Sequence, residues 1–252
     1  MLPLNKNSIL SHLNSPVSIQ VFDEIDSTNT FLKQNFTNLS SEHPSLVVAN
    51  SQSTGYGKFK RKFFSPNSGV YFSILLPHQL VKNPNLLTLA AGVAVCSVLK
   101  KIIPNGAFSL KWVNDILIDD LKCGGILAEN ISDDNGNSNY IVGIGVNINV
   151  KQFPNELIGI ASNIPQSQEF DRNLFIAEII NLFLELLSNN QQIIPQFRLL
   201  CSTFGHRVEV INGKQIVVGQ AVNVDDSGAL IVIDDKKNHH LFNSGEISKI
   251  SI

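Results

Sequence analysis

The alternation of apolar and polar positions predicts a chain that begins with strands and helices in mixed order. Short alternating or continuous apolar runs indicate strands, and longer runs with a 3.6-residue period indicate helices. The expected strands are 17–22, 46–49, 70–76, 108–113, 116–118, 125–128 and 140–148. The expected helices are 30–36, 86–103 and 173–187. Ser27 or Thr28 can cap the first helix, because a hydroxyl accepts a hydrogen bond from a first-turn N–H.

The pattern changes near Gly205. From there on, short apolar segments alternate with the turn signals NGK, DDSG and DDKKN. Closely spaced short strands are typical of a small antiparallel barrel, here of about 45 residues. We therefore expect an α+β domain over residues 1–203 and a small β domain over 204–252.

Composition narrows the class of protein. The chain has 252 residues, 43% of them hydrophobic, and a net charge of −2. This is enough apolar material for a core, and the charge does not suggest a general nucleic-acid or membrane-surface binder. The apolar run 86–99 is too short to cross a bilayer, so we expect a buried helix there.

The three cysteines, Cys96, Cys123 and Cys201, form no CxxC motif. No disulfide framework or cysteine-rich zinc site follows from them. The N-terminus has no unbroken apolar stretch of the kind found in signal peptides. We therefore expect the reducing cytoplasm as the compartment.

The first candidate site is the loop 51–69. Gly55 and Gly57 let the backbone approach a ligand, and four of the five residues 58–62 are basic. Such a loop suits a phosphate group. A solvated basic loop or a weak nucleic-acid patch is the alternative, and the sequence of a Walker A loop is absent.

The second candidate is the pair of segments 111–115 (KWVND) and 122–125 (KCGG). Lys111 alternates with the apolar Trp112 and so faces away from the core. Asn114 and Asp115 form an ordinary turn pair unless they contact a ligand. Lys122, beside two glycines, can hold a carboxylate or a phosphate, or is simply solvated.

The third candidate is the segment 143–149 (GIGVNIN). Glycines weaken a strand interior unless a ligand or a neighbouring element packs against the backbone. The histidines near the C-terminus lack a metal-ligand spacing, and no Ser-His-Asp arrangement is evident. Cys123, beside Lys122 but without a nearby histidine, is expected to be a plain small residue rather than a nucleophile.

Taken in order, these motifs resemble those of biotin–protein ligases, the BirA family. The resemblance covers residues 17–252. It is carried by DSTN (26–29), Gln52, the GYG loop (55–57) ending in Ser65-Pro66, KWVND (111–115), KCGGIL (122–127), GIGVNIN (143–149), DRN (171–173) and GEIS (245–248).

The resemblance implies a fold and a reaction. The fold would be a mixed sheet packed with helices, like that of class II aminoacyl-tRNA synthetases, followed by an SH3-like β-barrel. The enzyme would be an AMP-forming biotin–[acetyl-CoA-carboxylase] ligase. It would activate biotin with ATP and Mg²⁺ to biotinyl-5′-adenylate, then transfer biotin to a lysine of a biotin carboxyl carrier domain.

The resemblance also assigns site residues. Biotin contacts fall on Ser27, Thr28, Asn29, Gln52, Gly55, Tyr56, Gly57, Lys122, Gly125 and Gly143. ATP contacts fall on Lys58, Arg61, Phe63, Lys111, Asn114, Asp115 and Asn147. The catalytic set is Lys122, Arg61, Lys58 and Asp115.

Within this set, Lys122 would hold the biotin carboxylate and the α-phosphate, and Phe63 would stack near adenine. No residue is assigned as a direct Mg²⁺ ligand. The ion is expected on the ATP phosphates, with Asp115 as the candidate for an indirect contact.

Several positions depart from the family pattern. Tyr56 and Lys58 stand at arginine positions, Lys60 at a glycine and Phe63 at a tryptophan. Val113 replaces a proline, and Ile250 stands where some members have an arginine. Lys58 keeps the charge but loses the two-pronged hydrogen bonding of arginine. We expect the reaction class to be kept and the intermediate to be held less tightly.

Only 25 residues precede the DSTN motif, too few for a helix-turn-helix module. We therefore expect no N-terminal DNA-binding domain and no DNA or membrane partner, while an exposed sheet edge can support a homodimer. Three alternatives remain: a lipoate or octanoate ligase of the same fold, a non-catalytic biotin or nucleotide sensor, and an RNA-binding protein.

Overall fold

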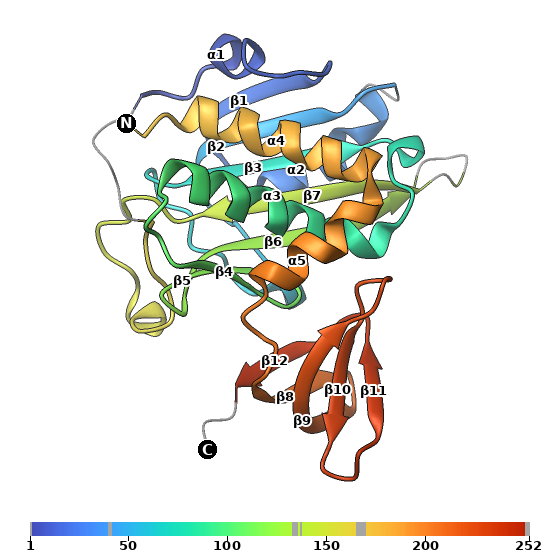
Figure 1. Cartoon of the computed structure of the whole chain (residues 1–252). Helices are drawn as coiled ribbons and strands as arrows, with labels where there is room; N and C mark the ends of the chain where they lie inside the picture. Colours follow the sequence, from blue (N-terminus) through green and yellow to red (C-terminus); the bar gives the residue numbers. More distant parts are fainter. Residues whose placement is uncertain (1, 40–41, 133–135, 137, 165–169, 250–252) are drawn as a thin grey trace.

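The computed structural model describes residues 2–39, 42–132, 136, 138–164 and 170–249, and its larger part is built on a seven-stranded mixed sheet (Figure 1). The strands are β1 (Ser18–Ile25), β2 (Ser45–Gln52), β3 (Val70–Leu76), β4 (Phe108–Lys111), β5 (Asp115–Ile118), β6 (Leu121–Ser132) and β7 (Ser138–Val146). Their order across the sheet is β1-β2-β3-β7-β6-β5-β4. β1 and β2 run parallel, and the other neighbours are antiparallel.

Helices cover both faces of this sheet. The helices are α1 (Lys6–Leu10), α2 (Thr28–Asn35), α3 (Leu87–Ile102), α4 (Arg172–Ser188) and α5 (Ile193–Leu200). Short 3₁₀ turns occur at Phe36–Asn38, Lys58–Lys60, His78–Leu80, Pro84–Leu86, Asn155–Leu157 and Asn190–Gln192. In Figure 1, α3, α4 and α5 lie on one face. α2 connects β1 to β2 and packs on the other face, where Leu32 contacts Val47, Leu75 and Ile141.

The C-terminal part is a five-stranded antiparallel sheet. Its strands are β8 (Arg207–Asn212), β9 (Gln215–Val224), β10 (Leu230–Asp234), β11 (His239–Phe242) and β12 (Glu246–Lys249). The order is β11-β10-β9-β8-β12. Within the described residues, no pairing joins β11 to β12. The strand pairing is therefore that of an open antiparallel sheet and not of the closed barrel that we expected. The division into a mixed α+β part and a small β part is confirmed.

Most predicted elements are present, with three corrections. The hairpin expected to turn at Asn114-Asp115 turns at residues 112–114, and Asp115 already belongs to β5, opposite Lys111. β6 runs beyond the predicted 125–128 at both ends. α1 and α5 had no prediction, because each is short and is stabilised by packing on α4 or on α3. Ile250 and part of the loop after Ser132 lie outside the described residues.

Helix α3 is the core helix of the larger part. With the preceding turn, the segment Pro84–Ile102 is long and apolar enough to cross a membrane. The expectation that this apolar run is too short to cross a bilayer, which considered residues 86–99 alone, is therefore wrong. The segment instead packs between the sheet and helices α4 and α5, where 67% of its most apolar 18 residues is buried.

The two parts meet at the β4–β5 hairpin. Trp112, 3% exposed, donates its indole N–H to the Gly228 carbonyl at 3.0 Å. Its backbone N–H donates to Thr203 Oγ1 at 2.9 Å. A Cβ on Gly228, which has φ +87°, would lie 2.6 Å from Leu89 of α3. This close contact requires glycine, and it seats the C-terminal sheet against the larger part of the chain.

We predict that Trp112→Phe lowers the free energy of unfolding by about 1–3 kcal/mol, because it leaves the buried Gly228 carbonyl without its donor. Chemical denaturation measures the change. Leu199→Ala is the control, since Leu199 is 86% exposed and its truncation is expected to be near neutral. Equal stability of the two variants would contradict the role given to the indole.

Candidate active site

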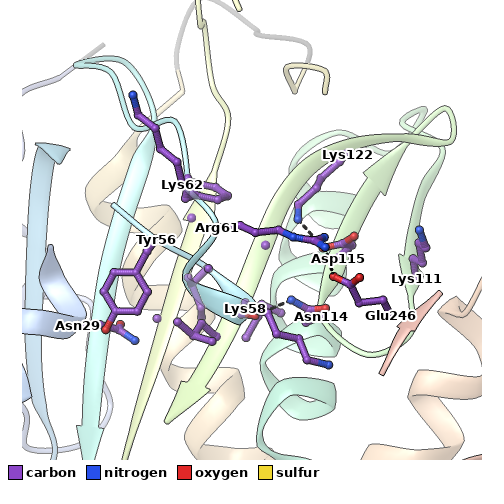
Figure 2. A pocket seen from close by; sticks show the side chains of 18 of the residues that line it. Asn29, Tyr56, Lys58, Arg61, Lys62, Lys111, Asn114, Asp115, Lys122 and Glu246 are labelled. Carbon is purple, nitrogen blue, oxygen red and sulfur yellow. Dashed lines mark hydrogen bonds and ion pairs between the residues drawn. The ribbon is translucent and has the colours of Figure 1, made fainter. Parts of the chain in front are cut away.

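A cavity of about 210 Å³ opens on the face of the large sheet that also carries α2. The strands β6 and β7 form its floor, and the loop after β2 (residues 53–69) covers it. The start of α2 closes one end, and the β11–β12 turn of the C-terminal sheet closes the other. Figure 2 shows lining side chains from the start of α2 (Asn29), the loop after β2 (Tyr56, Lys58 and Arg61), β6 (Lys122) and the C-terminal sheet (Glu246).

One end of the cavity is polar and uncharged. Ser27 caps α2 by accepting a hydrogen bond from the Thr30 N–H, as predicted. The Thr28 N–H donates to Gln52 Oε1 at 2.9 Å, and Thr28 Oγ1 lies 2.6 Å from Ser73 Oγ. Gln52 Nε2 donates to Ser65 Oγ at 3.0 Å. This end therefore holds several hydroxyl and amide groups in fixed positions.

The other end is cationic. Lys122 Nζ lies 2.5 Å from Asp115 Oδ1, and Arg61 Nη2 lies 2.5 Å from Glu246 Oε1. Figure 2 shows these two pairs side by side, across the cavity from Tyr56 and Asn29. Such partly exposed pairs contribute little to stability, because water and salt screen them. An anionic ligand can therefore compete with either carboxylate for its cation.

Lys58 belongs to the same end. Its Nζ donates to the Gly245 carbonyl at 2.8 Å. Burial lowers the pKa of the Lys58 ammonium, while the Glu246 and Asp115 carboxylates oppose that shift. A half-buried cation with a single neutral acceptor is well placed to receive a phosphate oxygen.

A β-bulge in β6 decides where Lys122 points. Lys122 pairs with Leu117, whereas Gly124 pairs with the adjacent Ile116, so β6 has one extra residue at this point. A bulge shifts the alternation of side chains along the strand. As a result Lys122 and Gly125, three residues apart, both line the cavity, and Cys123 is buried in the core.

Glycines let two side chains pack directly against the strand backbone at the floor of the cavity. A Cβ on Gly143 would lie 2.2 Å from Asn29 Oδ1, and one on Gly145 would lie 2.4 Å from the Phe63 ring. The close packing expected around these strand glycines is therefore supplied by Asn29 and Phe63. Phe63 also meets Tyr71 edge to face, with ring centroids 6.4 Å apart.

The structure brings most of the predicted site residues together. Those lining the cavity are Ser27, Thr28, Asn29, Gln52, Tyr56, Gly57, Lys58, Arg61, Phe63, Lys111, Asn114, Asp115, Lys122, Gly125 and Gly143. Gly55 and Asn147 are not among them. Gly55 packs against Gln52 and Ser65. Asn147 donates from Nδ2 to the Ser162 carbonyl at 3.3 Å, which corrects the expectation that it faces the cavity.

Sequence reasoning missed other lining residues, among them Lys62, Trp112, Leu127, Gly145, Gly245, Glu246 and Ile247. The GEIS segment was noticed as a motif, but nothing in the sequence indicates that the C-terminal sheet closes this cavity. Glu129 was missed as well. It shares a strand face with Gly125 and Leu127, and this alternation could have indicated it.

The described residues contain no group of three or more His, Cys, Asp or Glu side chains able to hold a metal ion. Asp115 and Glu246 are the carboxylates lining the cavity, and each already has a cationic partner. Magnesium is commonly held by one or two carboxylates together with substrate phosphates. A single carboxylate such as Asp115 fits that mode but does not make a metal site alone.

Comparison with known families gives two matches that divide the chain as the fold does. Residues 21–149 match the biotin/lipoate A/B protein ligase family. Residues 203–250 match the biotin protein ligase C-terminal domain. The second match includes the β11–β12 turn that closes the cavity.

Similar proteins include the bifunctional ligase/repressor BirA of Bacillus subtilis, 29% identical over 84% of this chain and 68% of that protein. The biotin–[acetyl-CoA-carboxylase] ligase of Mycobacterium tuberculosis is 28% identical over 90% of this chain and 89% of that protein. Among solved structures, the biotin protein ligase of Aquifex aeolicus in complex with biotin and ATP aligns with a TM-score of 0.80. The identity is 26%, over 92% of this chain and 99% of that one.

We predict that Gly143→Ala lowers the free energy of unfolding by about 1–3 kcal/mol, because the new methyl group displaces Asn29 from its hydrogen bonds. Chemical denaturation measures the effect. Gly57→Ala is the matched control, since the atom nearest to its added Cβ is 4.0 Å away. A Gly143→Ala protein as stable as Gly57→Ala would show that Asn29 is not held there.

Proposed function

The chain belongs to the biotin/lipoate A/B protein ligase family, and we propose that within it this protein is an ATP-dependent biotin–protein ligase. The observation that carries the proposal is a single cavity with an uncharged polar end and a cationic end. Biotin has the same division, with a cyclic urea at one end and a carboxylate at the other. The match to the biotin protein ligase C-terminal domain supports biotin over lipoate.

The proposed reaction has two steps. A carboxylate oxygen of biotin attacks the α-phosphorus of ATP, forming biotinyl-5′-adenylate and releasing pyrophosphate. The ε-amine of a carrier lysine then attacks the acyl carbon of the adenylate. An amide forms, AMP leaves and the amine loses a proton.

The uncharged polar end would bind the cyclic urea. A urea has two N–H donors and one carbonyl acceptor, so its site needs groups of both kinds. Ser27, Thr28 and Gln52 provide hydroxyl and amide groups at this end. The glycines of the floor let Asn29 and Phe63, which line the cavity, lie directly against the strand backbone.

The cationic end would hold the groups on which negative charge accumulates. Lys122 would exchange Asp115 for the biotin carboxylate and then for the α-phosphate. Arg61 and Lys58 would leave Glu246 and the Gly245 carbonyl for the remaining phosphates. Preorganised cations at such positions can contribute a factor of ~10²–10³ in rate each.

Magnesium would arrive on the phosphates of ATP, where it neutralises their charge. Asp115, freed from Lys122, would be its protein contact or would orient the incoming lysine. The partner we propose is the biotin carboxyl carrier domain of acetyl-CoA carboxylase. We place the reaction in the cytoplasm, in keeping with the free cysteines Cys96, Cys123 and Cys201.

Pyrophosphate–ATP exchange tests the proposed function directly. Purified protein with Mg²⁺ is assayed with biotin and with lipoate in parallel. Exchange with biotin alone is the expected result. Exchange with lipoate alone would move the protein to the lipoate branch of the family, and no exchange with either would favour a binding protein without catalysis.

We predict that Lys122→Ala lowers the rate of biotin-dependent exchange by at least ~10²-fold, because it removes the cation nearest the reacting carboxylate. Lys214→Ala is the control, since Lys214 is exposed in the β8–β9 turn. A Lys122→Ala protein with a near-normal rate would exclude the role given to this lysine.

A further inference from the structure

Glu129 is a carboxylate with an unusual number of partners just outside the cavity. Its two oxygens accept hydrogen bonds from Lys33 Nζ at 2.5 Å, from Asn29 Nδ2 at 2.8 Å and from the Tyr56 hydroxyl at 2.9 Å. Its side chain is 19% exposed. Of these partners Asn29 and Tyr56 line the cavity, whereas Glu129 does not. Any effect of Glu129 on a ligand must therefore act through them.

The carboxylate fixes the orientation of the Asn29 amide. An ionised carboxylate can only accept hydrogen bonds, so the amide must turn its NH₂ group toward Glu129. The Asn29 oxygen then faces Ser73, whose hydroxyl donates to it at 2.5 Å. Ser73 is fully buried, and its one proton is used in this bond.

The same constraint passes on to Thr28. Ser73 Oγ has no proton left for Thr28 Oγ1, 2.6 Å away, so the Thr28 hydroxyl must be the donor in that contact. The Thr28 proton is then also committed. Gln52 Oε1 lies within hydrogen-bond distance of Thr28 Oγ1, at 3.2 Å, but it also accepts the Thr28 backbone N–H at 2.9 Å and so does not depend on the hydroxyl proton.

We propose that Glu129 is a positioning residue for cyclic-urea recognition, because it sets the direction of donation along Asn29, Ser73 and Thr28. With this direction fixed, Thr28 Oγ1 presents only lone pairs to the cavity. It therefore accepts a hydrogen bond from a urea N–H and rejects a ligand that offers a carbonyl there. This assignment rests on the proposed function, since it takes the cyclic urea of biotin as the ligand.

We call the hydrogen-bonded series Glu129–Asn29–Ser73–Thr28 the relay. It requires an ionised Glu129, and the local charges keep Glu129 in that form. Burial raises the pKa of the Glu129 carboxyl, but hydrogen bonds from Lys33, Asn29 and Tyr56 outweigh burial and leave it below its ordinary value. The carboxylate therefore remains an acceptor at neutral pH. A glutamine at this position can instead donate to the Asn29 oxygen, which lets the whole relay reverse.

A second role for Glu129 must be separated from the relay. Through Tyr56 and Lys33 it also attaches the loop after β2 to β6 and α2. Ser73→Ala separates the two roles, because it interrupts the relay between Asn29 and Thr28 and leaves the loop contacts of Glu129 in place. Lys33→Met does the opposite, since it removes an ion pair of Glu129 and keeps the relay.

The test measures biotin binding by calorimetry and the KM values for biotin and ATP in the exchange assay. Glu129→Gln and Ser73→Ala are each expected to raise the Kd and KM for biotin about 10- to 100-fold, the effect of one mismatched buried hydrogen bond, with the KM for ATP within about twofold. Lys33→Met is expected to stay within about threefold of the wild type. Wild-type affinity in Ser73→Ala, or an equal loss in Lys33→Met, would overturn the relay.

A measurement that needs no ligand makes failure of the relay distinguishable from failure of the proposed function. In NMR spectra, we expect a downfield proton resonance for the Asn29 side-chain N–H that faces the carboxylate, both in the wild type and in Lys33→Met. In Glu129→Gln we expect this downfield shift to be lost. Unchanged Asn29 resonances in Glu129→Gln would overturn the proposal, whatever the exchange assay gives. A wild type without biotin-dependent exchange would instead overturn the proposed function.

Discussion

The site is built on two glycines of β7, because a side chain at either position would displace a residue that lines the cavity. At Gly143 and Gly145 a single added carbon would collide with Asn29 or with Phe63. These two side chains come from segments far away in the sequence, the start of α2 and the loop after β2. The glycines of β7 thus let the start of α2 and the loop after β2 pack directly on this strand, and both ends of the site depend on that packing. Glycine is costly in a strand interior, so this arrangement gives up local stability for close approach.

The cationic end depends on a different constraint, the seating of the C-terminal sheet. Trp112 and Gly228 hold that sheet against the β4–β5 hairpin, and this brings Glu246 and the Gly245 carbonyl to Arg61 and Lys58. The two cations are therefore positioned before any anion arrives. Their present partners are a partly exposed carboxylate and a backbone carbonyl, both of which a phosphate can replace. The small sheet is in this way part of the site.

The polar and cationic ends are connected through the loop after β2. Tyr56 near its start hydrogen-bonds to Glu129, and Ser65 at its end accepts from Gln52. The basic residues between these two anchors reach the C-terminal sheet. Ligand groups at either end thus contact side chains that hold the same loop. This physical connection suits an enzyme in which a carboxylate and a nucleotide must meet in a fixed geometry.

The sequence alone determined the order of most elements, the two-part organisation and the residue types of the site. Hydrophobic periodicity is a local property, and the functional groups of motifs such as KWVND and KCGGIL follow directly from their residue types. Only the tertiary structure decided that Lys122 and Gly125 share a face, because a one-residue bulge in β6 breaks the alternation. The same holds for Asn147, which ties two chain segments together, and for Glu246, which comes from another sheet. Glu129 shows the limit most clearly: its role depends on a hydrogen-bonded series that joins α2, β3 and β6, and no pattern along one strand encodes contacts between three elements.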